Sequence, residues 1–401
     1  GNYLMATDPL LFEPLKIREV TLPNRIVLSP LCMYSANSGV ASDWQFAHLS
    51  TFARGGVGLV FAEATAVEPR GRITPRCLGI WTDEQADALK PITSFISSMG
   101  SVPGIQIAHA GRKASASPPW DGGKPVDIGD STWGDPGWQV VGASAVPLAD
   151  GWQTPKAMSE AEISELVSAF ADSARRSAEA GFKVLEMHGA HGYLIHSFLS
   201  PLSNQRNDKY GGDLEGRMRF ALEVAKAVRA SWPEELPLFF RVSAVDNNGW
   251  ELDDSVVLAR ALKSIGVDVI DCSAGGITGA PAFRAKDDGT PIKSSGERPR
   301  GFQVPYASEI KKEAEIKTMA VGRIIDAEQA ETILRDRDAD LIGIGRELMY
   351  NPFWGLHAAE TLKNETALEG WPDQYRWAIT RRADLEKMTD DNLDFGLKVG
   401  E

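Results

Sequence analysis

Short apolar runs alternate along this chain with longer amphipathic stretches, and the alternation occurs eight times. The short runs are rich in Val, Ile, Leu and Phe, which is typical of strands that are buried on both faces. We predict strands at 25–28, 58–63, 104–108, 184–188, 238–242, 269–272, 318–321 and 341–344.

The longer stretches carry apolar residues at helical spacing, and several of them begin with a helix-start signal. Ser159 followed by Glu162 matches a capping box, and Thr82 precedes an acidic first turn. We predict helices at 44–54, 83–99, 160–180, 214–231, 254–265, 304–314, 327–335 and 352–363.

Eight strand–helix units in a chain of 401 residues predict an α/β fold, a closed (β/α)8 or TIM barrel, in which residues 1–401 form a single domain. A doubly wound open sheet is the alternative fold. We favour the barrel because no Gly-x-Gly-x-x-Gly turn follows the first predicted strand, as a dinucleotide-binding sheet would require.

Two connections are longer than the usual loops of such a fold. The connection at about 110–156 contains Trp120, Trp133, Trp138 and Trp152, which is too aromatic for a linker, so we predict a folded lid over the barrel mouth. The polar segment 275–303 is either a mobile flap or a surface loop. The tail at about 365–401 is not expected to add a domain.

Composition and charge narrow the possible partners. The net charge of −13 disfavours a nucleic acid, which binds through clustered Lys and Arg. No apolar run approaches the roughly 18–20 residues that span a bilayer, and the first residues lack a signal-peptide pattern. The cysteines Cys32, Cys77 and Cys272 are too scattered for a disulfide framework or a metal site. We therefore expect a cytoplasmic protein without a nucleic acid or membrane partner.

Polar and aromatic residues follow several of the predicted strands, where barrel enzymes carry their chemistry. We expect these residues to converge on one pocket. They are Ser29, Pro30, Leu31, Cys32, Met33, Tyr34, Ala64, Gln106, His109, His188, His191, Tyr193, Arg241, Gly322, Arg323, Gly345 and Arg346.

Two pairs in this set, Gly322-Arg323 and Gly345-Arg346, follow the last two predicted strands. Glycines there let backbone N–H groups approach a phosphate, and the arginines add positive charge. Two ordinary tight turns are the alternative. We favour a phosphate site because both pairs occur where barrels bind phosphate.

The segment from His188 to Tyr193 leaves the fourth predicted strand with two imidazoles and a phenol. Two imidazoles can hold a carbonyl oxygen, and a nearby phenol can deliver a proton. Metal binding and a purely structural role are the alternatives, although no neighbouring carboxylate or thiolate completes an evident metal set. We expect His196, further along the chain, to be structural.

Together these segments resemble the old yellow enzyme family, and more narrowly its thermophilic-like class of FMN-dependent ene-reductases. The similarity extends over nearly the whole chain. The segments that carry it are 12–15, 22–26, 29–34, 104–113, 188–204, 208–212, Arg217 and 340–346.

The resemblance implies a flavin at the barrel mouth, reduced by NADPH or NADH and reoxidised by small α,β-unsaturated carbonyl compounds. It assigns Tyr34, His188 and His191 to the substrate oxygen and Tyr193 to proton donation. Cys32 matches the thiol beside the flavin N5, and Arg241 matches the cation near N1 and O2. The resemblance assigns further flavin contacts to Ser29, Pro30, Leu31, Ala64, Gln106 and His188, with the phosphate at Gly322, Arg323, Gly345 and Arg346.

The resemblance also implies a homo-oligomer. Members of this class often insert an arginine from a neighbouring subunit's C-terminal segment into the active site, and the comparable segment here offers Arg376 and Trp377 in an altered order. The lid at 116–150 is longer than in the most compact members. The chain lacks the length and the cysteine cluster of the multidomain members, which carry an iron–sulfur cluster.

Two other functions stay open at this point. A non-redox lyase or isomerase could use the same phosphate site for a phosphorylated substrate. A catalytically silent flavin-binding protein could act through contacts between subunits. An FMN-dependent ene-reductase is the interpretation that we favour.

Overall fold

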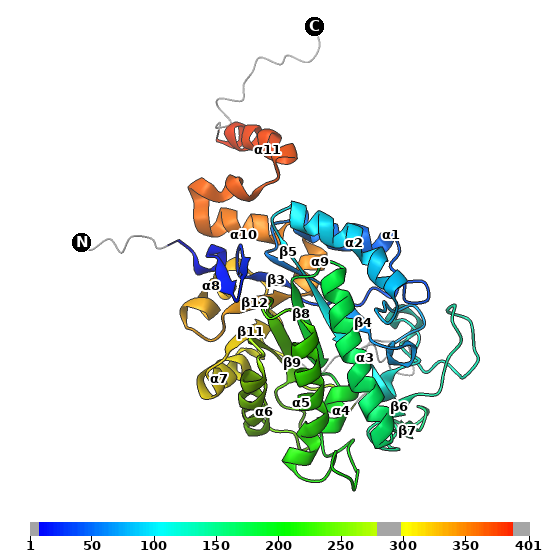
Figure 1. The fold of residues 1–401 in the computed structure, drawn as a ribbon. Coiled ribbons are helices and arrows are strands. Elements are labelled where there is room, and N and C mark those ends of the chain that lie inside the picture. The colour runs from blue at the N-terminus through cyan, green and yellow to red at the C-terminus, as the bar shows by residue number, and fades with distance from the viewer. Residues whose placement is uncertain (1–7, 279–297, 388–401) are drawn as a thin grey trace, which may run out of the picture.

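The computed structural model describes residues 8–278 and 298–387, and its central feature is a closed barrel of parallel strands (Figure 1). The strands follow one another around the barrel in the order β10-β11-β12-β3-β4-β5-β8-β9. This arrangement confirms the predicted (β/α)8 fold. The strands are β3 (Ile26–Leu28), β4 (Leu59–Ala66), β5 (Val102–Ala108), β8 (Val184–Gly189), β9 (Leu238–Ser243), β10 (Val269–Ser273), β11 (Lys317–Val321) and β12 (Leu341–Ile344).

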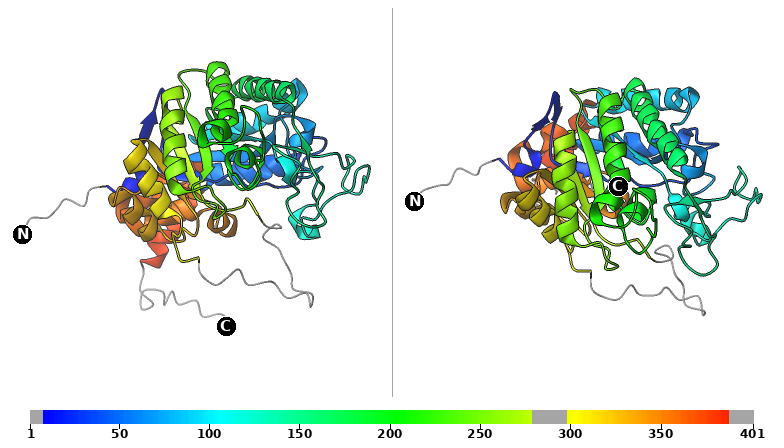
Figure 2. Two further views of the ribbon diagram at one scale, coloured as in Figure 1. Left: turned by 90° about the horizontal axis from the view of Figure 1, so that it is seen from below. Right: turned by 60° about the horizontal axis from the view of Figure 1, so that its bottom comes forward.

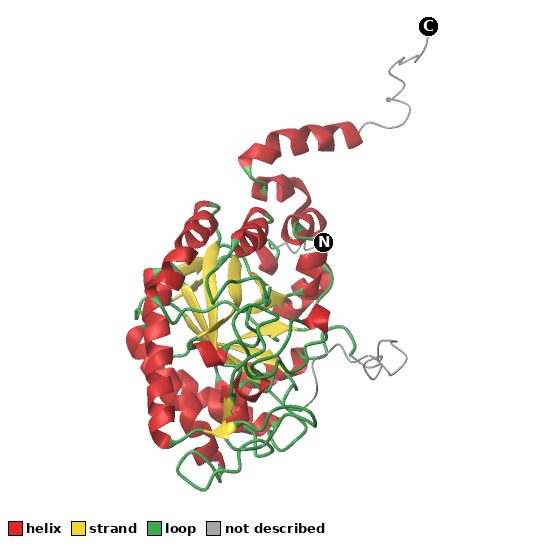
Figure 3. Ribbon diagram, turned by 90° about the vertical axis from the view of Figure 1, so that its right-hand side faces the viewer, coloured by secondary structure: helices red, strands yellow, loops and turns green. Residues whose placement is uncertain are grey.

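All eight predicted helices are confirmed, and they surround the strands (Figure 3). Ser159 and Thr82 each accept a hydrogen bond from the backbone of the residue three positions on, which confirms the capping box predicted at Ser159 and adds one at Thr82. The helices are α1 (Asp43–Arg54), α2 (Asp83–Ser98), α3 (Glu160–Glu179), α5 (Leu214–Ser231), α6 (Leu252–Ile265), α7 (Val304–Ala314), α8 (Ala327–Arg335) and α10 (Trp354–Lys363).

A hairpin that the sequence pattern did not predict closes the amino-terminal end of the barrel. Its strands β1 (Leu15–Ile17) and β2 (Val20–Leu22) are antiparallel. Ile17 and Leu22 pack into the same buried cluster as Phe61 and Phe239 from the barrel interior. The amino-terminal end is therefore filled with apolar side chains, which leaves polar chemistry to the opposite end.

The lid is folded, as predicted, and lies beside the carboxyl-terminal ends of the strands (Figure 2). It contains two short 3-10 helices, η3 (Gly111–Lys113) and η4 (Pro119–Asp121), and the paired strands β6 (Val141–Gly142) and β7 (Lys156–Ala157). The guanidinium of Arg72, from the connection after β4, lies 5.2 Å from the ring centre of Trp81 and 5.0 Å from that of Trp138. It also bonds to Asp135 of the lid. These contacts fasten the lid to the barrel.

The carboxyl-terminal tail contributes helix α11 (Asp373–Glu386), which has no buried residue and extends away from the barrel in Figures 1 and 3. The Nη1 of Arg54 donates a hydrogen bond of 2.5 Å to the Tyr375 hydroxyl and links the two. Of the polar segment 275–303, residues 279–297 lie outside the described residues. Within 8–278 and 298–387, no helix has the length and apolar character needed to cross a membrane.

Candidate active site

The end of β8 presents His188 toward the mouth of the barrel. His188 is 3% exposed, and its Nδ1 accepts a hydrogen bond of 3.3 Å from the Ala190 N–H. Because a backbone N–H can only donate, Nδ1 carries no proton and the neutral ring bears its hydrogen on Nε2. The His191 ring lies 5.4 Å from the His188 ring, centre to centre. The turn therefore brings the two predicted imidazoles together, with an N–H of His188 available as a donor.

Both imidazoles are held in their neutral form. Burial lowers the pKa of His188 and of His191 well below the ordinary histidine value, and the positive charge of Arg241 lowers both further. A neutral imidazole can still donate one hydrogen bond to a negatively charged oxygen. The pair is thus suited to stabilise charge without itself acting as an acid at neutral pH.

Tyr193, at the start of α4 (Leu194–Leu199), completes the turn. Its ring lies 4.9 Å from the His188 ring and packs against Ala110, Ala114 and Val140 of the lid region. Burial raises the pKa of Tyr193 above the ordinary tyrosine value. The phenol therefore keeps its proton at neutral pH beside the two imidazoles.

Lys113 is a site residue that sequence reasoning missed. Its Nζ donates hydrogen bonds to the carbonyl oxygens of His191 at 2.7 Å and of Gly276 at 2.5 Å, and it lies 5.5 Å from the Tyr193 ring centre. Burial lowers the pKa of Lys113 to about 8, and Arg112 contributes to this shift. Lys113 fixes a turn in which His191 adopts a left-handed φ of 61°. Its position beside the strand-end Gln106 and His109 was the available signal.

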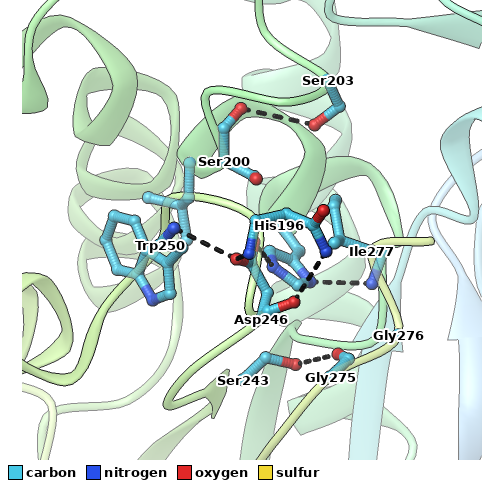
Figure 4. A network of polar contacts seen from close by, with 12 residues as sticks. His196, Ser200, Ser203, Ser243, Asp246, Trp250, Gly275, Gly276 and Ile277 are labelled. Atoms are coloured by element: carbon cyan, nitrogen blue, oxygen red, sulfur yellow. Dashed lines mark hydrogen bonds and ion pairs between the residues drawn. The ribbon is translucent and has the colours of Figure 1, made fainter.

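A polar network lies directly behind this turn (Figure 4). The Nδ1 of His196 accepts a 2.8 Å hydrogen bond from the Gly192 N–H, and its Nε2 lies 3.1 Å from Asp246 Oδ2. The other oxygen of Asp246 accepts the backbone N–H of Trp250 at 3.0 Å. Ser243 accepts the His191 N–H at 2.9 Å and donates to the Gly275 carbonyl at 2.8 Å. The network ties the turn to the loops that follow β9 and β10.

The residues after β3 line a second part of the same site. Burial raises the pKa of the Cys32 thiol well above its ordinary value, and hydrogen bonds from the Ala64 backbone and the Tyr34 side chain only partly oppose this shift. Tyr34 meets Trp120 of the lid edge to face, with ring centres 5.8 Å apart. Cys32, Tyr34 and Ala64 therefore lie together, as the sequence predicted.

Glu63, which the sequence analysis did not select, supports this second part of the site. Burial raises the pKa of Glu63 to about 8, while the neighbouring Met33 and Leu78 backbones and Gln45 act in the opposite direction. The Glu63 carboxyl group therefore lies next to the segment that carries Cys32 and Tyr34. A glutamate inside a predicted apolar strand was the signal that could have identified it.

Gln106 and Arg241 project from β5 and β9. Gln106 is 1% exposed, and its Nε2 donates a 2.8 Å hydrogen bond to Glu186. The Nε of Arg241 donates to the Ser273 hydroxyl at 3.0 Å. His188 and Arg241 occupy paired positions on β8 and β9, so their backbones are adjacent. The predicted strand-end residues thus converge from both sides of β8.

The two glycine–arginine pairs end the neighbouring strands β11 and β12. Gly322 and Arg323 both have left-handed φ values, 108° and 48°, and Gly345 precedes the short helix α9 (Arg346–Tyr350). Arg323 and Arg346 are exposed. The turns therefore lie on adjacent strands, with both cations accessible to solvent.

His109 plays a different part from the other strand-end residues. Its Nε2 lies 2.8 Å from Glu68 Oε1, and its Nδ1 accepts the Gly111 N–H at 3.0 Å. Both ring nitrogens are thus committed to neighbouring protein groups. Within the described ranges, no group of three or more His, Cys, Asp and Glu side chains is placed to hold a metal ion.

The residues at the mouth fit a flavin. The Ser29 hydroxyl is 3% exposed and has no hydrogen-bond partner among residues 8–278 and 298–387, so it has room for a ligand contact. The Arg241 guanidinium lies on the opposite side of the strand-end cluster, where it can face a ring that becomes negatively charged on reduction. A donor set of hydroxyl, amide and guanidinium groups suits a polar heterocycle.

Comparison with known proteins gives a consistent result. Residues 10–365 match the family described as "NADH:flavin oxidoreductase / NADH oxidase family". An NADPH dehydrogenase of Geobacillus sp. (strain WCH70) is 44% identical over 359 residues, covering 88% of this chain and 95% of that protein. The NADPH dehydrogenase of Bacillus subtilis (strain 168) is 42% identical, with 88% and 96% coverage.

Solved structures agree with these sequence relatives. The old yellow enzyme homologue from Zymomonas mobilis superposes with a TM-score of 0.70 at 25% identity, covering 90% of this chain and 96% of that one. Morphinone reductase gives a TM-score of 0.69 at 24% identity, covering 89% and 91% of the two chains. The barrel and its order of elements are therefore shared with these structures.

Proposed function

We propose that this chain, which belongs to the NADH:flavin oxidoreductase / NADH oxidase family, reduces activated C=C bonds of α,β-unsaturated carbonyl compounds. It is an FMN- and NAD(P)H-dependent oxidoreductase of the old yellow enzyme type. The observation that carries the proposal is the turn after β8. It combines a free N–H on neutral His188, neutral His191 and protonated Tyr193.

Seven residues and two turns would hold the cofactor. Ser29, Gln106 and Arg241 offer polar contacts to the isoalloxazine, with Cys32 and Ala64 beside it, and Pro30 and Leu31 complete the β3 end. The turns Gly322-Arg323 and Gly345-Arg346 would take the phosphate, because backbone N–H groups and positive charge meet there. When bound, FMN supplies the hydride transfer between the nicotinamide and the substrate.

The imidazoles orient the substrate. His188 donates from Nε2 to the carbonyl oxygen. His191, whose ring centre lies 5.4 Å from that of His188, contacts the same oxygen. Tyr34 lines the opposite wall together with Trp120. Donors aimed at the oxygen stabilise the negative charge that develops there as the β-carbon receives a hydride.

Tyr193 supplies the proton. Its raised pKa keeps the phenol protonated until a stronger base, the developing enolate carbon, forms next to it. Its contacts with Ala110, Ala114 and Val140 hold the ring in place and exclude water from that side. Tyr193 thus delivers a proton to the α-carbon, while the two histidines act on the oxygen.

The experiment that tests the proposal measures anaerobic NADPH and NADH consumption with a panel of enones, enals and maleimides. We expect a yellow protein that consumes nicotinamide only when an unsaturated carbonyl acceptor is present. A colourless protein would favour the non-redox lyase or isomerase, and a yellow protein that reduces none of the acceptors would favour a silent flavin-binding protein.

We also propose that the chain self-associates through α11. The helix has no buried residue, and Trp377 is 63% exposed on it. Arg376 and Trp377 are the side chains available to reach a neighbouring active site. Light scattering tests this proposal: a dimer or larger species is expected, whereas a fully active monomer at micromolar concentration would refute a shared site.

A further inference from the structure

Four polar side chains form a layer that faces the barrel interior just inside the mouth, where Arg241 and Asp271 are in register with His188. Gln106, Glu186, Arg241 and Asp271 come from the consecutive strands β5, β8, β9 and β10. Gln106 pairs in register with Glu186, and Arg241 with Asp271, and residues in register on parallel strands point to the same face. Glu186 precedes His188 by two positions, so it lies on the same face but deeper.

The contacts within this layer leave oxygens of two carboxyl groups without a hydrogen-bond donor. Gln106 Nε2 donates to Glu186 Oε2 at 2.8 Å, and Arg241 Nε lies 3.6 Å from Asp271 Oδ2. Both carboxyl groups are 0% exposed. The Oε1 of Glu186 and both carboxyl oxygens of Asp271 receive no hydrogen bond from the described residues. Three buried oxygens thus lack a donor.

This arrangement is unfavourable if both groups are ionised. Two buried carboxylates would face one guanidinium, and removing an ion from water costs several kcal/mol even after the protein relaxes. A single proton on Glu186 Oε1 resolves the mismatch, because it supplies a donor to Asp271 while Oε2 still accepts from Gln106. A proton on Asp271 instead would neutralise the carboxylate that lies next to Arg241.

We propose that Glu186 is a neutral acid that donates to an ionised Asp271, and that the charge of Asp271 sets how strongly Arg241 stabilises the reduced flavin. The inference rests on the proposed flavin site, since Gln106 and Arg241 are the members of the layer assigned to the cofactor. Glu186 and Asp271 are positioning residues that act through these two side chains.

The pKa shifts of the two groups agree in direction. Burial raises the pKa of both carboxyl groups. At Glu186 the negative charge of Asp271 raises the pKa further and outweighs the opposing positive charge of Arg241. At Asp271 the charge of Arg241 is the second-largest cause and opposes the rise. Glu186 is therefore the partner that keeps the proton.

Redox titration of three FMN-loaded proteins tests the charge assignment. Glu186→Gln replaces the neutral acid by a neutral amide that can make both of its hydrogen bonds, so we expect an unchanged flavin midpoint potential. Adding Asp271→Asn to this variant removes only the charge at position 271 and leaves Arg241 uncompensated. We expect the double variant to favour reduced over oxidised flavin at least tenfold more than the single variant, which is about 30 mV for a two-electron couple.

Infrared spectroscopy of the protein provides a measurement that does not depend on the flavin. The carbonyl band of a buried protonated carboxylic acid is expected in the parent protein at neutral pH and should be lost in Glu186→Gln. Glu63→Gln is the matched control, because Glu63 is another buried glutamate with a raised pKa. The part of the band that survives in Glu63→Gln and is lost in Glu186→Gln belongs to Glu186.

The outcomes separate this inference from the proposed function. The inference is overturned if Glu186→Gln retains the whole protonated-acid band, or if that single variant shifts the potential as much as the double variant does. Loss of the band in a protein that reduces no unsaturated carbonyl compound would support the proton assignment and contradict the proposed function. If Glu186→Gln fails to fold, Glu63→Gln labelled with 13C at the glutamate side-chain carboxyl decides the question: a surviving band that shifts on labelling belongs to a glutamate, and an unshifted or absent band overturns the inference.

Discussion

His188 and His191 at the barrel mouth differ from His196, a few positions further along the chain, in what their ring nitrogens bind. Both nitrogens of His196 are occupied, one by the Gly192 N–H and the other by Asp246. His188 uses only Nδ1, and neither ring nitrogen of His191 bonds to any residue within 8–278 and 298–387. The two histidines at the mouth thus have ring nitrogens without a partner among the described residues, whereas both ring nitrogens of His196 have one.

This difference in hydrogen bonding separates side chains that are available to a ligand from side chains that stabilise the fold. A buried polar group without a partner is costly, so it persists where a ligand supplies the missing contact. A buried polar group with every partner in place stabilises a single arrangement of the chain. We therefore propose that the mouth-facing pair acts on the substrate, and that the His196–Asp246 pair keeps the turn in the geometry that this action needs.

The largest effect is expected from Tyr193→Phe, which removes the proposed proton donor from the mouth-facing region. A positioned acid contributes about 10²–10⁴ in rate, so reoxidation of the flavin by an enone should slow by up to that factor. Flavin reduction by NADPH needs no such acid and should stay near the parent rate. Stopped-flow absorbance of each half-reaction measures the two effects separately.

Tyr210→Phe is the control for this prediction. Tyr210 is also buried, but its hydroxyl donates to Glu223 at 2.8 Å, away from the mouth, so both half-reactions should be unchanged. If Tyr193→Phe instead impairs reduction and leaves reoxidation intact, then Tyr193 serves nicotinamide binding and the assignment of the proton donor is wrong.

His196→Ala should affect the free energy of unfolding more than the chemistry. It removes a hydrogen bond to the buried Asp246 carboxylate, and hydrogen bonds to charged groups contribute about 1.5–3 kcal/mol. His196→Gln, which can still reach Asp246, should recover more stability than His196→Asn, which can still reach Gly192. Urea denaturation gives the comparison. A slowing of reoxidation comparable with that of Tyr193→Phe, at unchanged stability, would place His196 in the catalytic region.

The smallest effect is a difference in pH dependence. The folded pKa of His188 lies well below the unfolded value of about 6.5, so the unfolded chain takes up a proton first as the pH falls. The stability that neutral His188 contributes is therefore complete above about pH 6.5 and is lost below it. This loss is about 1 kcal/mol between pH 6.5 and pH 5.5. His188→Asn should remove this pH-dependent loss of stability. The free energy of unfolding of the parent protein should therefore fall further over this pH range than that of the variant, by the same amount.

The same comparison between the parent protein and His196→Gln should give a smaller pH-dependent loss of stability. Burial lowers the pKa of His196, but the bond and charge of Asp246 raise it and offset part of the shift. Buried carboxyl groups with raised pKa values, such as Glu63, change stability in the opposite sense over this range, but they are common to parent and variants and cancel. Equal pH effects for His188→Asn and His196→Gln would contradict the claim that the two histidines differ in how far their pKa values are lowered.

Most of the fold could be predicted from the sequence. Strands buried on both faces give continuous apolar runs, and amphipathic helices between them give a second period, so all eight barrel units were visible. The β1–β2 hairpin was not, because strands of three residues are too short to show an alternation. Helix α11 gives only a weak signal for another reason: it buries no side chain, so it has no apolar stripe.

Site residues that follow a strand could be predicted from the sequence. Contacts that depend on how the strands are aligned with one another could not. His188, Arg241 and Gln106 each follow or end a visible strand. The influence of Glu186 and Asp271 on each other joins β8 to β10, which are separated in the barrel by β9, and no spacing in the sequence reveals it. Lys113 gains its role only because the chain folds back over His191 and Gly276.

The most direct test of the account follows the two hydrogens that are added to the substrate. The protein is supplied, under turnover and without oxygen, with cyclohexenone and with NADPH deuterated at the transferable position of C4. If the hydride reaches the β-carbon through the flavin while Tyr193 protonates the α-carbon, the saturated ketone carries deuterium at the β-carbon and a solvent-derived hydrogen at the α-carbon. Deuterium at the α-carbon, or the absence of any saturated product, would contradict the account.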